Sequence, residues 1–477
     1  MTQPLLSRRE CLTRAGCGFG ALALAGLEAE RASAREAVGI DPLAARLPHF
    51  APRAKRVIFL FMQGGVSQVD SYDYKSRLTA ADGERIPFDD ARTIANTGAR
   101  GTEQRVMKPL WKFARRGECG RWASDLFPGV NRHVDDLCFI HSLHTEGVAH
   151  GPATLFLHCG ATNFVRPSVG AWAVYGLGTE NANLPGFVSI APSAGNGGPR
   201  NYASAFLPPV YQGTPIGRAS GPATGASIRD LRGPLAPAER QALSDLLRAL
   251  NAEQLRRAPG DAEFEAVLNS YELAGRMQLT APEVLDLSRE SAETQRLYGI
   301  GDPKTDAFGR RCLLARRLCE AGVRFIQVTY GDDGANPAWD QHSDMPKHAE
   351  HAAAVDRPIA GLLADLKRRG LLEDTLVWWG SEFGRTPYSQ ANGTGRDHNP
   401  DGFTVWLAGG GVRPGFAYGE TDEFGHRAVR DRVHMHDLHA TVLHLLGLDH
   451  ERLTYRYAGR DFRLTDVHGR VVSEILA

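Results

Sequence analysis

The sequence predicts an α/β fold in which helices flank a mostly parallel central sheet. Two observations lead to this prediction. Continuous apolar runs, typical of strands buried on both faces of such a sheet, recur along the chain. They alternate with stretches of helical periodicity that end at Gly322, Gly370 and Gly447. Strand and helix in this order imply right-handed crossovers between parallel strands.

Each element follows from its local pattern. The predicted strands, all apolar runs, are 56–62, 323–330, 375–379 and 403–407. The predicted helices, all with apolar residues at helical spacing, are 306–321, 346–369 and 437–446. Pro358 predicts a kink, or two shorter helices, within the second helix. Asp437 is a plausible N-cap of the third.

Three other regions differ in composition and in the pattern of apolar residues. Residues 215–300 contain charged amphipathic helices with no strand between them, which predicts a helical insertion packed beside the sheet. Residues 191–217 are rich in Gly, Pro, Ser and Asn, and form either a surface connection or a loop covering a site. The tail predicts a small terminal β element. We expect residues 35–477 to form a single domain.

Composition bounds the function classes. The 477 residues are 42% hydrophobic and 23% charged, which excludes a disordered chain, collagen and a coiled coil. Fifty-five basic residues balance fifty-five acidic ones. Because no net charge would attract a polyanion, we expect no nucleic-acid partner.

The N-terminus predicts export. Arg8 and Arg9 precede an uncharged stretch over 15–27, and 32–34 (ASA) offers a small-x-small cleavage site. We interpret residues 1–34 as a twin-arginine signal peptide that directs the protein to the periplasm or cell surface. The alternative is an N-terminal membrane anchor, but this stretch is short and rich in Gly and Ala. We expect no transmembrane segment in the mature chain.

Polar residues follow the predicted strands, where an open parallel sheet places its ligands. Asp340 and His342 follow one strand, Glu382 follows the next, and His398 lies shortly beyond. Two oxygen and two nitrogen donors suit zinc or another divalent transition metal. Taken singly, an Asp-x-His segment also fits a capped turn, and a Glu after a strand also fits a helix cap.

Further groups could complete this site. Arg385 and Arg396 could clamp an oxyanion, or form local salt bridges. Asp70 could be a further metal ligand, or cap the following turn. His150, at a predicted helix start, and the Thr154 hydroxyl could reach the sheet edge and take part in catalysis. A bound metal could then polarise an ester and activate water as the nucleophile.

Several segments, in order, resemble a bacterial family catalogued as domain of unknown function 1501, which is related to the sulfatases and the alkaline-phosphatase superfamily. They are the twin-arginine segment, FLFMQGGVSQVDSYDYK, WDQHSD, TLVWWGSEFGRTP, GRDHNP, LAGGGVRPG, YGETDEFG and DLHATVLHLLGLD. The resemblance spans essentially the mature chain. It implies an alkaline-phosphatase-like core with metal ligands on loops at the strand ends. By position, 339–342 resembles the superfamily's Asp and His loop, 381–384 its Ser-Asp-His-Gly motif, and His398 its later single His.

The chain also departs from the superfamily pattern. Phe383 stands where that motif has a ligating His, and Gly64 where the first strand usually ends in a ligating Asp. No Cys-x-Pro-x-Arg or Ser-x-Pro-x-Arg sequence is present. A single-metal or remodelled site is therefore expected. The leading hypothesis is an exported metal-dependent hydrolase of a phosphate or sulfate ester, with a small anionic ester or a glycan as substrate. The alternative is a non-catalytic binding or scaffold protein that retains the fold.

Overall fold

The structure is a computed structural model of the chain, and it describes residues 41–88, 103–221, 262–390 and 393–477 with scattered positions between 239 and 253. The predicted signal peptide, residues 1–34, lies outside the described residues. No helix in these ranges is both long and apolar enough to cross a membrane.

A mostly parallel sheet forms the centre of the described chain, as predicted. Its nine strands are β1 (Arg56–Met62), β6 (Leu137–His144), β7 (Phe187–Ile190), β8 (Thr214–Ile216), β9 (Phe325–Tyr330), β10 (Thr375–Gly380), β13 (Phe403–Ala408), β14 (Phe416–Tyr418) and β17 (Val433–His434). Eight follow the order β14-β6-β13-β10-β1-β9-β7-β8, with β17 beside β6. Strand β13 runs antiparallel to both of its neighbours, and the other pairs are parallel.

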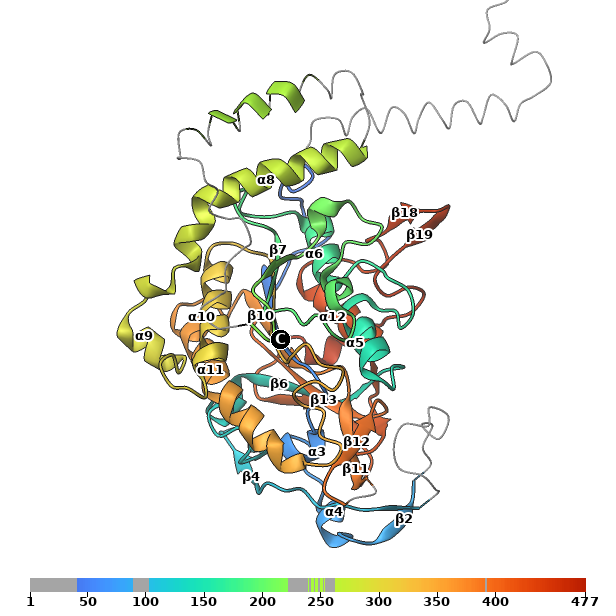
Figure 1. Cartoon of the computed structure of the whole chain (residues 1–477). Coiled ribbons are helices and arrows are strands. Elements are labelled where there is room, and N and C mark those ends of the chain that lie inside the picture. Colours follow the sequence, from blue (N-terminus) through green and yellow to red (C-terminus); the bar gives the residue numbers. More distant parts are fainter. Residues whose placement is uncertain are drawn as a thin grey trace, which may run out of the picture.

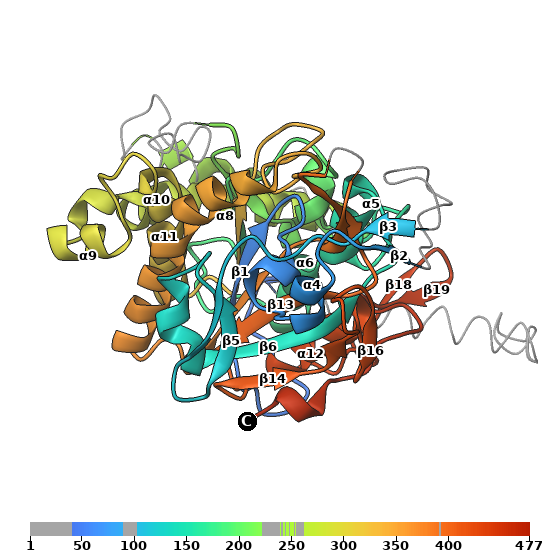
Figure 2. The same cartoon turned by 90° about the horizontal axis from the view of Figure 1, so that it is seen from below.

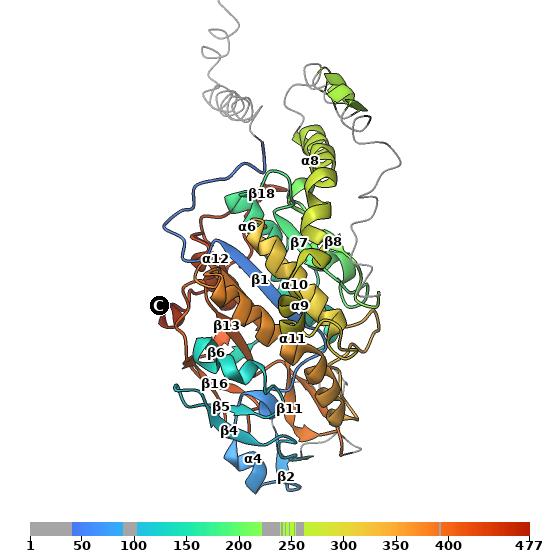
Figure 3. The ribbon, with the colours of Figure 1, turned by 90° about the vertical axis from the view of Figure 1, so that its left-hand side faces the viewer.

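Helices cover both faces of the sheet (Figures 1 and 3). Alternate residues of β1 separate the two layers because successive side chains of a strand point to opposite faces. Phe59 packs in one apolar core with α5 (His150–Cys159), α6 (Val169–Leu177) and α12 (Met435–Leu445). Leu60 packs in the other core with α10 (Asp306–Glu320) and α11 (His348–Arg368). Burying such side chains stabilises the fold by roughly 1.5–3 kcal/mol each.

Other elements lie around these layers. The remaining helices are α3 (Gln68–Ser71), α4 (Ser76–Ala80), α8 (Ala262–Leu285) and α9 (Ala292–Leu297). The remaining strands pair as β2 (Arg85–Pro87) with β3 (Glu103–Arg105), β4 (Phe113–Arg116) with β5 (Arg121–Ser124), β11 (Gly384–Ser389) with β12 (Arg396–Asn399), β15 (Glu420–Thr421) with β16 (Ala428–Arg430), and β18 (Tyr455–Tyr457) with β19 (Arg460–Phe462). Helices α8 and α9 fall within the predicted insertion, and β18 and β19 form the predicted terminal β element.

Several local predictions differ from the structure. Helix α11 continues through Pro358 as one helix rather than two shorter ones, and Pro358 is buried within it. The N-cap of α12 is His434, and Asp437 instead accepts the His434 backbone N–H from within the first turn. The 191–217 segment ends in β8, an edge strand of the sheet, rather than remaining loop. Strands β6 and β7 were not predicted.

Candidate metal centre

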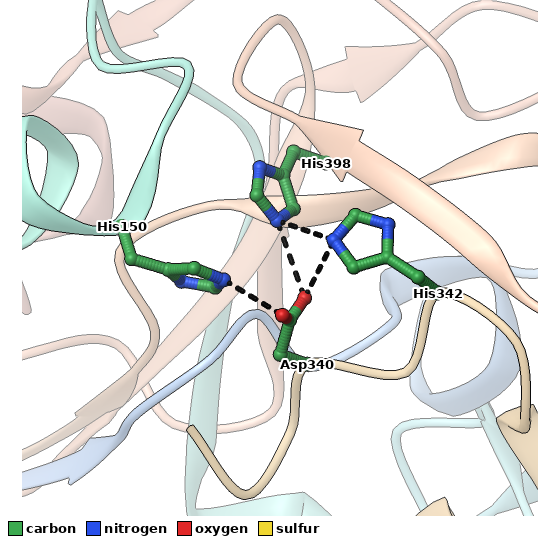
Figure 4. A group of neighbouring side chains, drawn as sticks. All are labelled: His150, Asp340, His342 and His398. Carbon is green, nitrogen blue, oxygen red and sulfur yellow. Dashed lines mark hydrogen bonds and ion pairs between the residues drawn. The ribbon is translucent and has the colours of Figure 1, made fainter. Parts of the chain in front are cut away.

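Four side chains from three separate segments meet at one edge of the sheet. His150 begins α5 after β6, Asp340 and His342 lie between β9 and α11, and His398 lies on β12. One nitrogen or oxygen atom of each lies within 4.8 Å of the others, a spacing that could hold a metal ion. We call these four residues the His/Asp cluster (Figure 4).

The Asp340 carboxylate is the centre of the cluster. Its Oδ2 lies 3.2 Å from His150 Nε2, and its Oδ1 lies 2.9 Å from His342 Nε2 and 3.2 Å from His398 Nε2. The Nε2 atoms of His342 and His398 are themselves 3.0 Å apart. Ligands on one metal at bonds of about 2.0–2.2 Å stand at comparable separations.

The opposite ring nitrogens of two histidines are held by oxygen acceptors. Nδ1 of His150 lies 2.8 Å from Glu382 Oε1, and Nδ1 of His398 lies 2.9 Å from the Val148 carbonyl oxygen. Because those oxygens accept hydrogen bonds, each Nδ1 carries a hydrogen, and each ring directs an Nε2 lone pair into the cluster when it is neutral. Outer contacts of this kind orient histidines that bind metals.

Burial and charge set the protonation of the cluster. Burial opposes ionisation of Asp340, but its contacts with the His150, His342 and His398 rings, together with the Arg385 charge, hold its pKa well below the usual value. Burial lowers the pKa of His398 to about 4; the contact with the Asp340 carboxylate opposes this, and the Arg385 charge adds to it. A neutral His398 therefore faces its lone pair toward His342 and an ionised carboxylate. A cation at this point would relieve that repulsion, so the donor set fits a divalent metal.

The pKa of His150 shifts in the opposite direction to that of His398. Burial lowers its pKa, but hydrogen bonds to Asp340 and Glu382 outweigh burial and raise that pKa above the usual value. The position between two carboxylates therefore favours positive charge. A metal ion would replace the proton there, because metal binding releases protons from its ligands.

Glu382 lies behind His150 rather than among the cluster atoms. Its carboxylate accepts the Gly64 backbone N–H at 3.0 Å and the Ser381 hydroxyl at 2.9 Å, besides contacting His150. Gly64 has φ +119°, and a Cβ on it would lie 2.8 Å from the backbone nitrogens of Trp339 and Asp340. Glycine is required for that close approach. The structure thus gives Glu382 an orienting position, where we expected a metal ligand.

The two arginines bind the protein's own acceptors. Arg385, cross-strand from His398, contacts Asp340 Oδ1 at 2.8 Å and also donates to the carbonyls of Gly64 and Gly65. Arg396 donates to Asp70 at 2.7 Å and to three backbone carbonyls. Both guanidinium groups are fully buried. With their donors already used, neither is placed to clamp a substrate oxyanion, contrary to our expectation.

Asp70 and Thr154 also lie outside the cluster. Asp70, expected as a further ligand, is fully buried and holds Arg396, the Ser67 hydroxyl and the Leu110 backbone N–H. Thr154 is buried one turn after His150 on α5, and its hydroxyl has no hydrogen-bond partner among the described residues. A catalytic role for Thr154 therefore stays a prediction, based on its position one turn after His150.

Sequence reasoning missed two features of this site. His150 was expected at the sheet edge as a catalytic group, yet it joins three of the five residues expected as ligands, Asp340, His342 and His398. The strand β6, which ends shortly before His150, was the signal for this, but its LCFIHSLH segment alternates imperfectly. Phe383 stacks on the His398 ring with centroids 4.3 Å apart, and so forms an apolar wall of the cluster.

Three solved structures of enzymes are among those to which the chain as a whole is similar. A sulfatase from Pseudoalteromonas sp. is 12% identical, with 84% of this chain and 69% of that one covered, at a TM-score of 0.33. An alkaline phosphatase from the Antarctic bacterium TAB5 is 14% identical, with 78% and 96% covered, at 0.31. A phosphonate monoester hydrolase from Silicibacter pomeroyi is 9% identical, with 88% and 76% covered, at 0.31.

No curated protein matches the chain. A family model does match, over residues 54–476, and its description is "Protein of unknown function (DUF1501)". Because the match covers most of the sequence, the chain belongs to the DUF1501 family.

Proposed function

We propose that this protein is a metal-dependent hydrolase of a phosphate or sulfate ester, with His150, Asp340, His342 and His398 as the metal ligands. One observation supports the proposal above the others. Three imidazole Nε2 atoms converge on the Asp340 carboxylate, while the outer nitrogens of two of those rings are already held by Glu382 and the Val148 carbonyl.

Three nitrogens and one carboxylate suit zinc or another divalent transition metal. When bound, such an ion supplies Lewis-acid polarisation of the ester oxygen and an acidified water as nucleophile. The protein's own groups hold the ligands in place. Arg385 fixes the Asp340 carboxylate from one side, and Glu382 fixes the His150 ring from the other.

Access to the site comes from the His342 side. The His342 side chain is 30% exposed, against 2% for Asp340. The ester would thus enter beside His342, and the buried rings of Phe383 and His398 would exclude water from their part of the cluster. Because Arg385 and Arg396 are occupied, the metal itself would provide most of the positive charge for the ester's anionic group.

Metal content and ester turnover test the proposal together. We would purify the wild type, His398→Ala and a matched control, His450→Ala, which removes a buried histidine bonded to Thr465 outside the cluster. Elemental analysis should find about one metal per chain in the wild type and the control, and none in His398→Ala. p-Nitrophenyl phosphate or p-nitrophenyl sulfate should be hydrolysed only by the loaded proteins.

Two results would decide against this function. A wild type that binds no divalent metal after incubation with zinc, manganese or magnesium would remove the metal centre. A stoichiometric metal without turnover of either ester would favour the non-catalytic binding or scaffold protein.

We infer that the protein acts in the periplasm or at the cell surface, exported by the twin-arginine route. The paired Arg8 and Arg9, the uncharged stretch and the small-x-small site support this. Replacing both arginines by lysine should leave the protein in the cytoplasmic fraction. Periplasmic recovery of that variant would contradict the route.

A further inference from the structure

A cavity lies at the β14 edge of the sheet, away from the His/Asp cluster. It encloses about 700 Å³, within the range of small-molecule binding sites. Its walls come from β6, β14, the β4–β5 hairpin and the residues that follow α3, and Figure 2 shows β5, β6 and β14 near one another. None of the four cluster residues lines it.

The charges on the cavity wall do not cancel locally. The acidic lining residues already have basic partners: Asp73 with Lys75, Glu420 and Asp431 with Arg430, and Glu474 with Arg470. Arg115, Arg121 and Arg413 also line the cavity, and no carboxylate of the described residues pairs with them. They donate instead to backbone carbonyls, at 3.1 to 3.2 Å. Basic side chains thus outnumber acidic ones on the wall by five to four, and three guanidinium groups have no ion-pair partner among the described residues.

Aromatic rings lie beside these arginines. Trp122 is 37% exposed, and its ring centroid lies 4.4 Å from that of Tyr74. The Arg413 guanidinium lies 3.9 Å from the centroid of Phe416, and Arg115 lies 5.2 Å from that of Trp122. Stacking on a ring holds a guanidinium in place while its edge stays open to a planar anion.

We propose that this cavity is a binding site for an acidic oligosaccharide, one that carries carboxylate or sulfate groups. The arginines would bind those groups through paired hydrogen bonds. The exposed part of the Trp122 side chain would contact the apolar side of a sugar ring. A sugar also offers hydroxyls that can donate to the Glu420 and Glu474 carboxylates on the cavity wall, which a polyphosphate chain cannot do.

Titration calorimetry on the full-length protein tests this site. The probes are tetragalacturonate and a chondroitin sulfate tetrasaccharide, with cellotetraose as the neutral match and ATP as the polyphosphate. Both acidic tetrasaccharides should bind, and binding should weaken as salt is raised. Arg121→Ala and Arg413→Ala should each weaken it about tenfold, the effect of losing one charge-assisted contact. The control Arg456→Ala, an exposed arginine of the β18–β19 hairpin outside this cavity, should bind like the wild type.

His398→Ala separates this site from the metal centre. This variant should bind both acidic tetrasaccharides with unchanged affinity, even when it has lost its metal and no longer hydrolyses an ester. The site is overturned if neither acidic tetrasaccharide binds, or if the cavity variants bind them like the control. Binding of ATP as tight as that of the tetrasaccharides, and lost in the same variants, would overturn the saccharide and leave only an anion pocket.

Discussion

Histidines gather in two regions of the molecule, and the regions differ in what lies between the rings. In the His/Asp cluster, three rings surround the Asp340 carboxylate and two of them are oriented by outer acceptors. At the start of α12, His434, His436 and His439 instead contact one another, with ring centroids 5.2 and 6.1 Å apart.

His150 of the cluster differs in protonation from the α12 histidines for the same reason, whereas burial lowers the pKa of His398 as it does theirs. Burial and the neighbouring histidines lower the pKa of His436 to about 2, and burial lowers that of His439 to about 4. In the cluster, two carboxylates raise the pKa of His150 despite burial. A central carboxylate with outer acceptors, rather than a high local density of histidines, therefore distinguishes a site suited to a cation.

The largest expected effect comes from removing that carboxylate. Asp340→Asn leaves the buried Arg385 guanidinium without its charged partner, which typically costs about 3–5 kcal/mol, and it removes the central metal ligand. Urea unfolding followed by circular dichroism should show the loss, and elemental analysis should find no metal. Asp437→Asn at the start of α12 is the control and should cost about 1 kcal/mol. Equal losses of stability in the two variants would contradict the difference between the two histidine regions.

Acid should destabilise the α12 region by a comparable amount. The folded-state pKa of His439 lies near 4, below the ordinary value of 6.5, so the unfolded chain binds the proton first. The corresponding stability is complete above pH 6.5 and is lost as pH falls toward 4, by about 3 kcal/mol. His439→Gln retains a donor for the Leu157 carbonyl and should lose that much less stability between pH 7.5 and 4.

The measurement is urea unfolding across that pH range on protein treated with EDTA, so that metal release adds nothing. An identical acid response in His439→Gln and wild type would contradict a neutral, buried His439.

A smaller effect is expected behind His150. Glu382→Gln keeps an acceptor for the ring but removes the charge, and changes of this kind typically lower metal affinity or activity about 10- to 100-fold. Competition with a chelator gives the affinity. Glu146→Gln is the matched control, because its carboxylate lies 3.9 Å from His434 Nε2 beside α12. A loss in the control as large as in Glu382→Gln would show that Glu382 has no particular orienting effect.

Most of the layered fold can be predicted from the sequence, because buried strands and amphipathic helices have strong local patterns. Strands β1, β9, β10 and β13 and helices α10 and α12 lie within a few residues of their predicted positions. Strand β6 was missed because polar His141, Ser142 and His144 interrupt its apolar run. Local pattern could not show which of the predicted site residues meet, because that depends on the topology of the chain. Asp340, His342 and His398 come together as expected, whereas Asp70 and Arg396 pair with each other.

Strand β13 shows where site residues can lie when one strand of a mostly parallel sheet is reversed. A reversed strand begins where its parallel neighbours finish, so residues just upstream of it reach the edge that other strands supply from downstream. His398 stands a few positions ahead of Phe403 and arrives at the cluster by that route. His398 lies well beyond the end of β10, so its place at the cluster is explained better by its position just before the reversed strand β13.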